Sequence, residues 1–304
     1  MFVSGGGSRG SSLLRKGAVL MAGGGVYGVT AYMTYIYLQP PPVAPATIDD
    51  NNGSNENNNH PHGSCVHHPL RTKQFEKVAS CYDTSIGRDE FFMGINVLRR
   101  ALLYFHARGT CLEVGAGTAR NLPYYPRGTR VLLTDQSEQM LQQAAAKIKQ
   151  YNSTNHKNAA PRFALLPEPQ DAASLDGLPS HAFDTVIDTF GLCSYDDPAK
   201  VLREMVRLCK PDGGKILLLE HGRSHSWPWV TRHLDRTAER HAALWGCVWN
   251  RDLDALLEQV SDVLEVQILR TWHFGTTYYI VCRPKRTTAT NLTIPKETVL
   301  STTA

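Results

Sequence analysis

Between residues 91 and 282, hydrophobic and polar positions follow two alternating periods. Apolar residues recur at three- and four-residue steps, a spacing that predicts helices, in 91–105, 137–150 and 198–209. Short and mostly apolar runs predict strands at 110–114, 130–135, 163–166, 183–189, 215–220, 263–269 and 277–282. Strands that alternate with helices form βαβ units, so we expect an α/β fold with a mostly parallel central sheet. Ligands of such sheets bind outside the carboxyl ends of the strands.

A glycine loop follows the first predicted strand. The run CLEV (111–114) gives way to GAGT (115–118), and glycines let a backbone approach a ligand closely. The loop lacks the GK[ST] ending of a phosphate-binding Walker loop, and Arg120 stands where a dinucleotide fingerprint has its third glycine. Asp135 ends the next strand, where it can accept hydrogen bonds from ribose hydroxyls. These residues favour a ligand with a ribose but no phosphate, such as S-adenosylmethionine.

The N-terminal part of the chain is typical of a membrane anchor. Residues 1–16 form a basic leader and 17–38 contain no charged residue. A helix of that length spans about 33 Å, enough to cross a hydrocarbon core of about 30 Å; a buried core helix is the alternative. Residues 39–63 predict a disordered tether and the Thr-rich 284–304 a disordered tail. We therefore expect the globular domain over 64–283.

The leader also predicts a location. It contains arginine and serine, and no acid appears before Asp49, a composition that favours mitochondrial import over secretion. Basic residues precede the apolar segment, which keeps the N-terminus on the matrix side. We expect a single-pass protein of the mitochondrial inner membrane whose domain faces the intermembrane space. The alternative is the endoplasmic reticulum membrane, where the sequons at Asn52, Asn152 and Asn291 would be glycosylation candidates.

Composition narrows the class of function. The net charge of +4 over 304 residues is mild, and we expect no nucleic-acid partner because nucleic-acid-binding domains are much more basic. The seven cysteines include no CxxC pair, and we interpret them as reduced structural thiols. Four histidines cluster near Cys65, at positions 60, 62, 67 and 68. Solvated linker histidines are favoured there over a metal site, since no ligand spacing recurs.

The order and spacing of four motifs resemble the class I S-adenosylmethionine-dependent methyltransferases, over about residues 75–283. The motifs are LEVGAGT, LLTDQSEQML, QDA before LPSHAFDTVIDT, and VLREMVRLCKPDGGKILLLEHG. The resemblance implies a Rossmann-like fold and S-adenosyl-L-methionine as cofactor. The runs FEKVASCYD (75–83), MGINVLRRAL (93–102) and GTARNLPYY (117–125) look like those of the fungal mitochondrial inner-membrane methyltransferase-like proteins. The Trp-rich C-terminal part is similar, more loosely, to the methyltransferase-like 7 group. Both groups are anchored to membranes at the N-terminus, which fits attachment here through residues 17–38.

The resemblance implies a role for each motif. The glycine loop would surround the methionine part of the cofactor, the acid after the second strand would hold the ribose, and the residues after the fourth strand would lie beside the sulfonium. Tyr82 is expected in a lid over the cofactor or packed on the first helix, and Ala119 stands where many members carry a third glycine. The expected cofactor contacts are Tyr82, Glu113, Gly115, Ala116, Gly117, Asp135, Gln136, Asp171, Ala172, Asp188 and Thr189.

Methyl transfer mainly requires alignment of the nucleophile, and a base is needed only for a protonated acceptor. His221, which follows strand 215–220, and Asp188 are the candidate catalytic residues. A hydrogen bond to the adjacent loop and capping of a turn are their respective alternatives. Residues 223–252 are expected to recognise the acceptor, with Trp227 and Trp245 on one face of a helical lid. Core packing of that face is the favoured alternative.

Three functions stay open. The first is a methyltransferase for a small apolar or lipid-like acceptor, such as a quinone, phospholipid or thiol. The second is an enzyme that methylates a protein or ribosomal RNA, although the mild net charge argues against RNA. The third is a non-enzymatic assembly or interaction factor; the set of Glu113, Gly115, Gly117 and Asp135 argues against it, because such a protein does not need a cofactor site. The sequence indicates neither the acceptor nor the oligomeric state.

Overall fold

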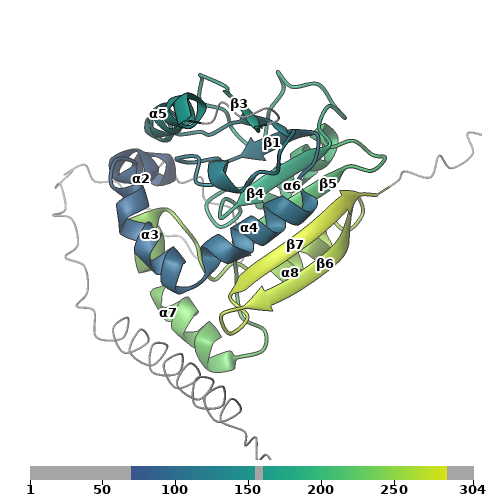
Figure 1. Cartoon of the computed structure of the whole chain (residues 1–304). Coiled ribbons are helices and arrows are strands. Elements are labelled where there is room, and N and C mark those ends of the chain that lie inside the picture. Colours follow the sequence, from purple (N-terminus) through teal and green to yellow (C-terminus); the bar gives the residue numbers. More distant parts are fainter. Residues whose placement is uncertain (1–69, 155–159, 286–304) are drawn as a thin grey trace, which may run out of the picture. The chain divides into compact units, whose positions relative to one another are not determined.

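The computed structural model describes residues 70–154 and 160–285. In this part of the chain, seven strands form one sheet in the order β3-β2-β1-β4-β5-β7-β6 (Figure 1). β7 pairs antiparallel with both β5 and β6, and the other neighbours are parallel. The α/β fold with a mostly parallel sheet is therefore confirmed. The strands are β1 (Thr110–Val114), β2 (Arg130–Leu133), β3 (Arg162–Leu165), β4 (Thr185–Thr189), β5 (Lys215–His221), β6 (Leu264–Trp272) and β7 (Thr277–Pro284).

Helices surround this sheet and connect its parallel strands. Three of them precede β1, of which α4 packs on β5 and β7, while α2 packs on α5 and α7. The helices are α2 (Leu70–Val78), α3 (Tyr82–Phe92), α4 (Ile95–His106), the short 3-10 helix η1 (Leu122–Tyr124), α5 (Glu138–Thr154), α6 (Pro198–Leu208), α7 (Pro228–Trp245) and α8 (Leu253–Gln259).

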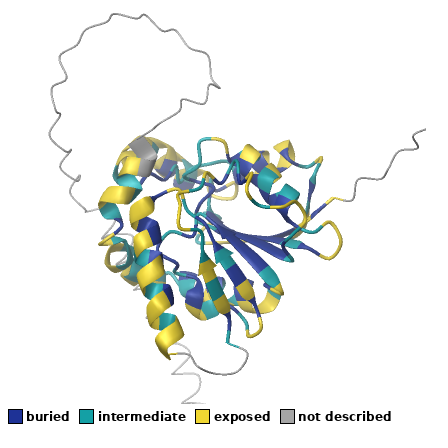
Figure 2. Ribbon diagram, turned by 90° about the horizontal axis from the view of Figure 1, so that it is seen from above, coloured by how far each residue is buried: buried dark blue, intermediate teal, exposed yellow. Residues whose placement is uncertain are grey.

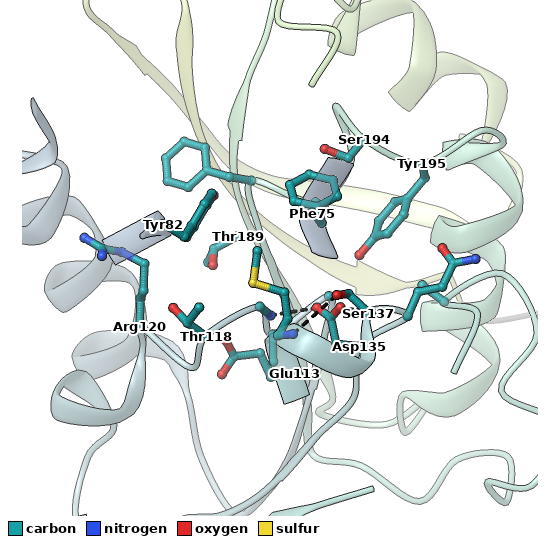
Figure 3. Close-up of a pocket in the computed structure, with 18 of the residues that line it drawn as sticks. Phe75, Tyr82, Glu113, Thr118, Arg120, Asp135, Ser137, Thr189, Ser194 and Tyr195 are labelled. Carbon is teal, nitrogen blue, oxygen red and sulfur yellow. Dashed lines mark hydrogen bonds between the residues drawn. The ribbon is translucent and has the colours of Figure 1, made fainter. Parts of the chain in front are cut away.

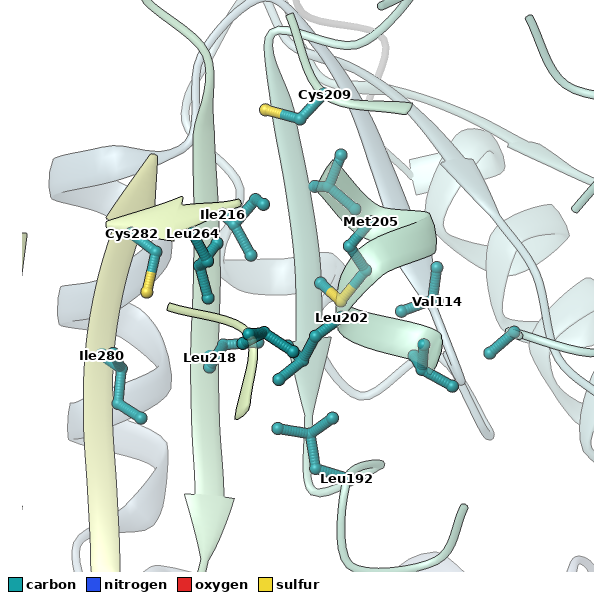
Figure 4. Close-up of a cluster of buried hydrophobic side chains, with 14 of the residues drawn as sticks. Val114, Leu192, Leu202, Met205, Cys209, Ile216, Leu218, Leu264, Ile280 and Cys282 are labelled. Carbon is teal, nitrogen blue, oxygen red and sulfur yellow. The ribbon is translucent and has the colours of Figure 1, made fainter. Parts of the chain in front are cut away.

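Successive strand residues face opposite sides of the sheet, so two hydrophobic cores form. In β5, Ile216 and Leu218 enter one core together with α6 and α8 (Figure 4), whereas Leu217 and Leu219 enter the other beneath α4. The central strands are buried and the outer faces of the helices are exposed (Figure 2). Both faces of the sheet are thus covered, which explains why its strands read as continuous apolar runs.

The helix expected over 91–105 begins later than its sequence pattern indicates. Gly94 takes a left-handed conformation (φ 69°) and separates α3 from α4. α3 was not predicted because it buries no residue and shows no amphipathic pattern. The two N-terminal helices α2 and α3 are therefore the main part of the fold that hydrophobic periodicity failed to indicate.

Several predicted segments lie outside the described residues. They are the leader 1–16, the apolar segment 17–38, the tether 39–63, the histidine cluster, and the tail beyond residue 285. Within 70–154 and 160–285, no helix combines the length and apolar character needed to cross a membrane. β7, the last described strand, ends at Pro284.

Candidate cofactor site

A pocket lies at the carboxyl ends of β1, β2 and β4 (Figure 3). It encloses about 870 Å³ of empty space, part of it open to solvent. Nine of the predicted contacts line it: Tyr82, Glu113, Gly115, Ala116, Gly117, Asp135, Gln136, Ala172 and Thr189. The structure therefore brings together most of the residues that the sequence motifs indicate.

The glycine loop needs its glycines for two different reasons. Gly115 and Gly117 both have a φ of 55°, a conformation that side chains disfavour. A Cβ on Gly115 would lie 2.3 Å from the hydroxyl oxygen of Tyr195, whereas a Cβ on Gly117 would meet no atom within 4 Å. Gly115 thus permits close packing inside the protein, and Gly117 leaves open space on the pocket side. Ala119 shares this conformation (φ 58°), which explains why a glycine suits that position.

Asp135 holds the loops after β1 and β2 together. Its carboxylate accepts hydrogen bonds from the backbone N–H of Gly117 (2.7 Å) and of Ser137 (2.8 Å). Burial raises the pKa of Asp135, and these backbone donors oppose that shift. A carboxylate has about four acceptor positions, so Asp135 retains capacity for a ligand hydroxyl. Gln136 follows it on the pocket wall.

Glu113 is buried beneath the glycine loop. It accepts hydrogen bonds from the Tyr125 hydroxyl (2.6 Å) and the Asn121 side-chain amide (2.9 Å). Burial raises the pKa of Glu113 to about 7, although both hydrogen bonds act to lower it. The carboxyl is thus close to half-ionised at neutral pH, and a positive charge beside it would favour the ionised form.

Three predicted site residues do not line the pocket. Asp171 caps the turn that follows it by accepting from the N–H of Ala173 (2.9 Å). Asp188 is fully buried in β4 behind the pocket wall, and burial raises its pKa well above the usual value. His221 lies behind Phe190, with ring centroids 4.4 Å apart, and burial lowers its pKa to about 4. Burial thus disfavours the charged form of both candidate catalytic groups, and neither lines the pocket.

Arg99 of α4 is a central site residue that sequence reasoning missed. Its guanidinium donates to Asn121 (3.0 Å) and Thr189 (2.9 Å), and it lies 4.9 Å from the centre of the Phe190 ring. The side chain is only 4% exposed. Arg99 lies on the buried face of an amphipathic helix. Its position within a stripe of apolar residues could have indicated that this arginine is buried.

A cluster of ion pairs joins α3 to the glycine loop, and we call it the α3 clasp. Arg120 pairs with Asp83 (2.9 Å) and Glu90 (2.5 Å). Thr118 donates to Asp83 (2.7 Å), and Lys147 of α5 pairs with the same carboxylate. Arg120 occupies the place of the third glycine of a dinucleotide fingerprint, and the clasp gives that arginine a structural role. It also sets α3, with Tyr82, at the pocket.

Other lining residues were not singled out from the sequence, although several of them lie inside its motifs. The segment after β4 contributes Phe190, which is strained at a φ of 62°, a conformation common at functional sites. The remaining residues that the sequence did not indicate are Phe75, Thr118, Arg120, Ser137, Met140, Gln170, Gly191, Ser194 and Tyr195.

The predicted lid 223–252 contains α7, which is mostly exposed. Only Val230 and Leu234 are buried in that helix, and neither Trp227 nor Trp245 lines the pocket. Trp227 instead forms an exposed aromatic cluster with Trp229 and Phe274, with ring centroids 5.6–6.4 Å apart. Most of α7 is thus not core, and its role in acceptor recognition stays a prediction.

The sheet, its glycine loop and the acid after β2 define a Rossmann-like ligand-binding fold. Residues 112–217 match the family described as a methyltransferase domain. These residues belong to a methyltransferase domain family, as the motifs predict, and S-adenosyl-L-methionine is the cofactor that this family implies.

Three curated relatives illustrate the range of the family. The chain is 36% identical over 225 residues to Methyltransferase OMS1, mitochondrial, of Saccharomyces cerevisiae, covering 70% of this chain and 46% of that protein. It is 32% identical over 141 residues to Phosphatidylethanolamine N-methyltransferase of Cereibacter sphaeroides, covering 46% and 63%. It is 30% identical over 164 residues to human Thiol S-methyltransferase TMT1B, covering 52% and 62%. The chain spans less than two thirds of each relative.

A solved structure agrees on the fold. A S-adenosylmethionine-dependent methyltransferase from Thermotoga maritima aligns with a TM-score of 0.50 at 16% identity, over 71% of this chain and 100% of that one. Such a distant likeness supports the fold alone. The chemistry must therefore be argued from the pocket itself.

Proposed function

We propose that this protein is a membrane-anchored S-adenosylmethionine-dependent methyltransferase that acts on a small apolar or lipid-like acceptor. The observation that carries the proposal is the convergence of Glu113, Gly117 and Asp135 on one pocket. Their chemistry suits a cationic amino-acid group, a close backbone approach and a ribose. The identities and the family match of residues 112–217 support the same reaction.

The residues present fit the cofactor. The open space beside Gly117 accepts a ligand, Glu113 would face its ammonium group, and Asp135 would accept from its ribose hydroxyls. Met140 and Ala172 provide an apolar wall of the kind that a purine ring needs. When bound, the cofactor supplies a methyl group that is already activated for displacement.

The acceptor side of the pocket favours a nucleophile that ionises easily. No histidine or lysine is among the described residues that line it. Burial raises the pKa values of Asp188 and of Tyr195 and lowers that of His221, which disfavours the charged form of each neighbour. Phe75, Tyr82 and Phe190 make the wall aromatic. We therefore favour an apolar thiol over a phospholipid amine or a quinone, and the name of the human relative, a thiol S-methyltransferase, is consistent with this choice.

The exposed aromatic cluster supports action at a membrane. Trp227 and Trp229 are each 45% exposed and Phe274 is 40% exposed, and aromatic rings of this kind settle at the interface between lipid and water. We propose attachment through residues 17–38 to the mitochondrial inner membrane, with the domain on the intermembrane-space side. The mitochondrial relative from yeast favours this organelle.

Calorimetry of the full-length protein in detergent, followed by a transfer assay, tests the proposal. Wild type should bind S-adenosylmethionine, and Asp135→Ala should weaken binding by roughly 1–3 kcal/mol through lost hydrogen bonds. Labelled methyl transfer is then compared for an alkyl thiol, a quinol and phosphatidylethanolamine, with the thiol expected to react fastest. A folded protein that gives no binding heat would refute the cofactor site.

Binding without transfer to any of these acceptors would favour the alternative of an assembly or interaction factor. In that case, metabolite and lipid profiles with and without the protein should be identical. Transfer of label to a protein band instead would favour a protein methyltransferase. Each alternative thus has an outcome of its own.

A further inference from the structure

Two thiols from distant parts of the chain meet beside the pocket. Cys193 lies in the segment after β4, and Cys247 lies between α7 and α8. Their sulfur atoms are 2.8 Å apart across 54 residues of sequence. The two side chains are 1% and 8% exposed. The other described cysteines form no such pair.

The backbone around the thiols already holds the two segments together. The N–H of Val248 donates to the carbonyl of Cys193 (2.9 Å), and the Arg251 guanidinium donates to the carbonyl of Tyr195 (2.9 Å). The sulfur separation exceeds a disulfide bond of about 2.05 Å by less than about 1 Å. A bond between the sulfurs therefore requires little movement of the chain.

The surroundings make the two thiols chemically unequal. Cys247 donates its S–H to Cys193, and this hydrogen bond, with Ser194 and the charge of Arg251, lowers the pKa of Cys193. The same bond and burial raise the pKa of Cys247 well above its usual value. Lone buried cysteines behave differently, since burial raises the pKa of Cys209 to about 12. Cys193 is thus suited to attack an oxidant, because the thiolate is the nucleophile.

We propose that Cys193 and Cys247 are a redox-active pair that closes reversibly to a disulfide. With a peroxide as oxidant, the Cys193 sulfur attacks the O–O bond, becomes a sulfenic acid and releases water. Cys247 then displaces hydroxide from that sulfur, and a second water forms. Two S–H bonds are lost, one S–S bond forms, and the peroxide accepts the two electrons. With a small disulfide as oxidant, exchange at Cys193 gives the same bond and two small thiols.

Formation of the disulfide would join the pocket segment 190–195 to the end of α7. Cys193 immediately precedes Ser194 and Tyr195, which line the pocket, and Tyr195 packs against Gly115. The 190–195 segment would then be tied covalently to the segment that follows α7. This pair does not depend on the proposed reaction, and it holds whether or not the protein transfers methyl groups.

Intact-mass analysis of the reduced full-length protein tests the pair. Hydrogen peroxide or oxidised glutathione at low excess should remove two hydrogens, and a tryptic peptide should link Cys193 to Cys247. Dithiothreitol should reverse both changes, and the closed form should unfold at a higher temperature. Cys209→Ser serves as the matched control, because it removes a buried thiol outside the pair and should leave closure unchanged.

Single variants separate the two roles. Cys247→Ser should leave a sulfenic acid at Cys193 that dimedone traps, whereas Cys193→Ser should lose both closure and trapping. The pair is refuted if the folded wild type keeps all its hydrogens under an oxidant that modifies the thiols of the urea-unfolded chain. It is also refuted if dimedone labels Cys193→Ser as strongly as Cys247→Ser, or if the cross-linked peptide joins other cysteines.

Discussion

At the scale of single residues, the fold controls the charge of the carboxyl groups around the site. Burial raises the pKa of Glu113 to about 7 and that of Asp188 well above its usual value. Glu220, near the end of β5, is also buried, and burial together with the charge of Asp188 raises its pKa well above the usual value. The protein interior around the pocket therefore disfavours negative charge on these carboxyl groups. A cationic ligand can change that, because it favours the ionised form of whichever carboxyl it meets.

The raised pKa of Glu113 predicts how cofactor binding depends on pH. Below about pH 7 the carboxyl is protonated in the ligand-free protein, and a cationic ligand must displace that proton. The affinity for S-adenosylmethionine should therefore rise with pH, by up to tenfold per unit, and level off above about pH 7. Calorimetry in buffers of different ionisation enthalpy measures both the affinity and the proton release. Glu113→Gln should show neither effect, and a flat profile in wild type would contradict the prediction.

The same group links pH to stability in the ligand-free protein. The pKa of Glu113 is higher in the folded state than in the unfolded state. Its contribution to the free energy of unfolding is therefore complete below the unfolded pKa near 4.5 and is lost as pH rises through about 7. A shift of this size corresponds to roughly 3 kcal/mol. Urea unfolding of wild type and Glu113→Gln between about pH 5 and pH 8 should show this loss in wild type alone.

Gly115 and Gly117 offer a matched pair of substitutions. Each Ala variant places a Cβ on a backbone with a φ of 55°, at a cost of roughly 1–2 kcal/mol. Only the Cβ at Gly115 also collides with the Tyr195 hydroxyl, 2.3 Å away. Gly115→Ala should therefore lower the free energy of unfolding more than Gly117→Ala, which should instead mainly reduce cofactor affinity. Equal losses of stability would show that Tyr195 moves aside.

At the scale of elements, polar contacts rather than buried apolar side chains attach the N-terminal helices α2 and α3 to the rest of the domain. α3 buries no residue, and the α3 clasp holds it through Asp83 and Glu90. α2 is joined to α7 by the Gln74 amide, which donates to the carbonyl of Leu244 (2.5 Å). These helices carry Phe75 and Tyr82, so the clasp determines whether one wall of the pocket is present.

Arg120→Ala should loosen the attachment of α3 and so disturb the pocket wall that contains Tyr82. Hydrogen bonds to charged groups contribute about 1.5–3 kcal/mol each, and Glu90 keeps Arg99 as a partner (2.8 Å). We expect weaker cofactor binding and faster proteolysis between residues 82 and 94, with little change in the melting temperature of the sheet. Arg88→Ala is the control, because Arg88 is an exposed residue of α3. Unchanged proteolysis in Arg120→Ala would mean that the clasp does not hold α3.

The contrast between local patterns and long-range contacts explains how much of the protein could be predicted from its sequence. The strands and the residues next to the glycine loop were predicted, because apolar runs and short motifs are local. α3 could not be predicted, because it is attached by ion pairs between residues far apart in the sequence, such as Glu90 and Arg120, which are 30 positions apart. Arg99 was missed because the pattern treats a charge on a helix as exposed, and Tyr195 because its loop has no periodicity. His221 was expected just after its strand, but it is the last residue of β5, and the Phe190 ring packs on it, which no local pattern indicates.

At the scale of the whole molecule, the exposed aromatic cluster and the predicted anchor suggest where the enzyme works. The proposed orientation puts the domain in the intermembrane space. Protease added to isolated mitochondria should digest the domain once the outer membrane is opened. Protection until the inner membrane is lysed would put the domain in the matrix, and glycosylated protein in microsomes would overturn the choice of organelle.

The position of β7 has a consequence for synthesis. It is the last described strand along the chain, yet it lies inside the sheet between β5 and β6. The edge of β5, with five successive buried residues, therefore lacks its partner until residues 277–284 have left the ribosome or a translocation channel. Unpaired apolar edges invite aggregation, so a chain stalled or cut before that point should be held by chaperones and degraded. Folding of the sheet is thus completed only when β7, its last described strand, has been synthesised.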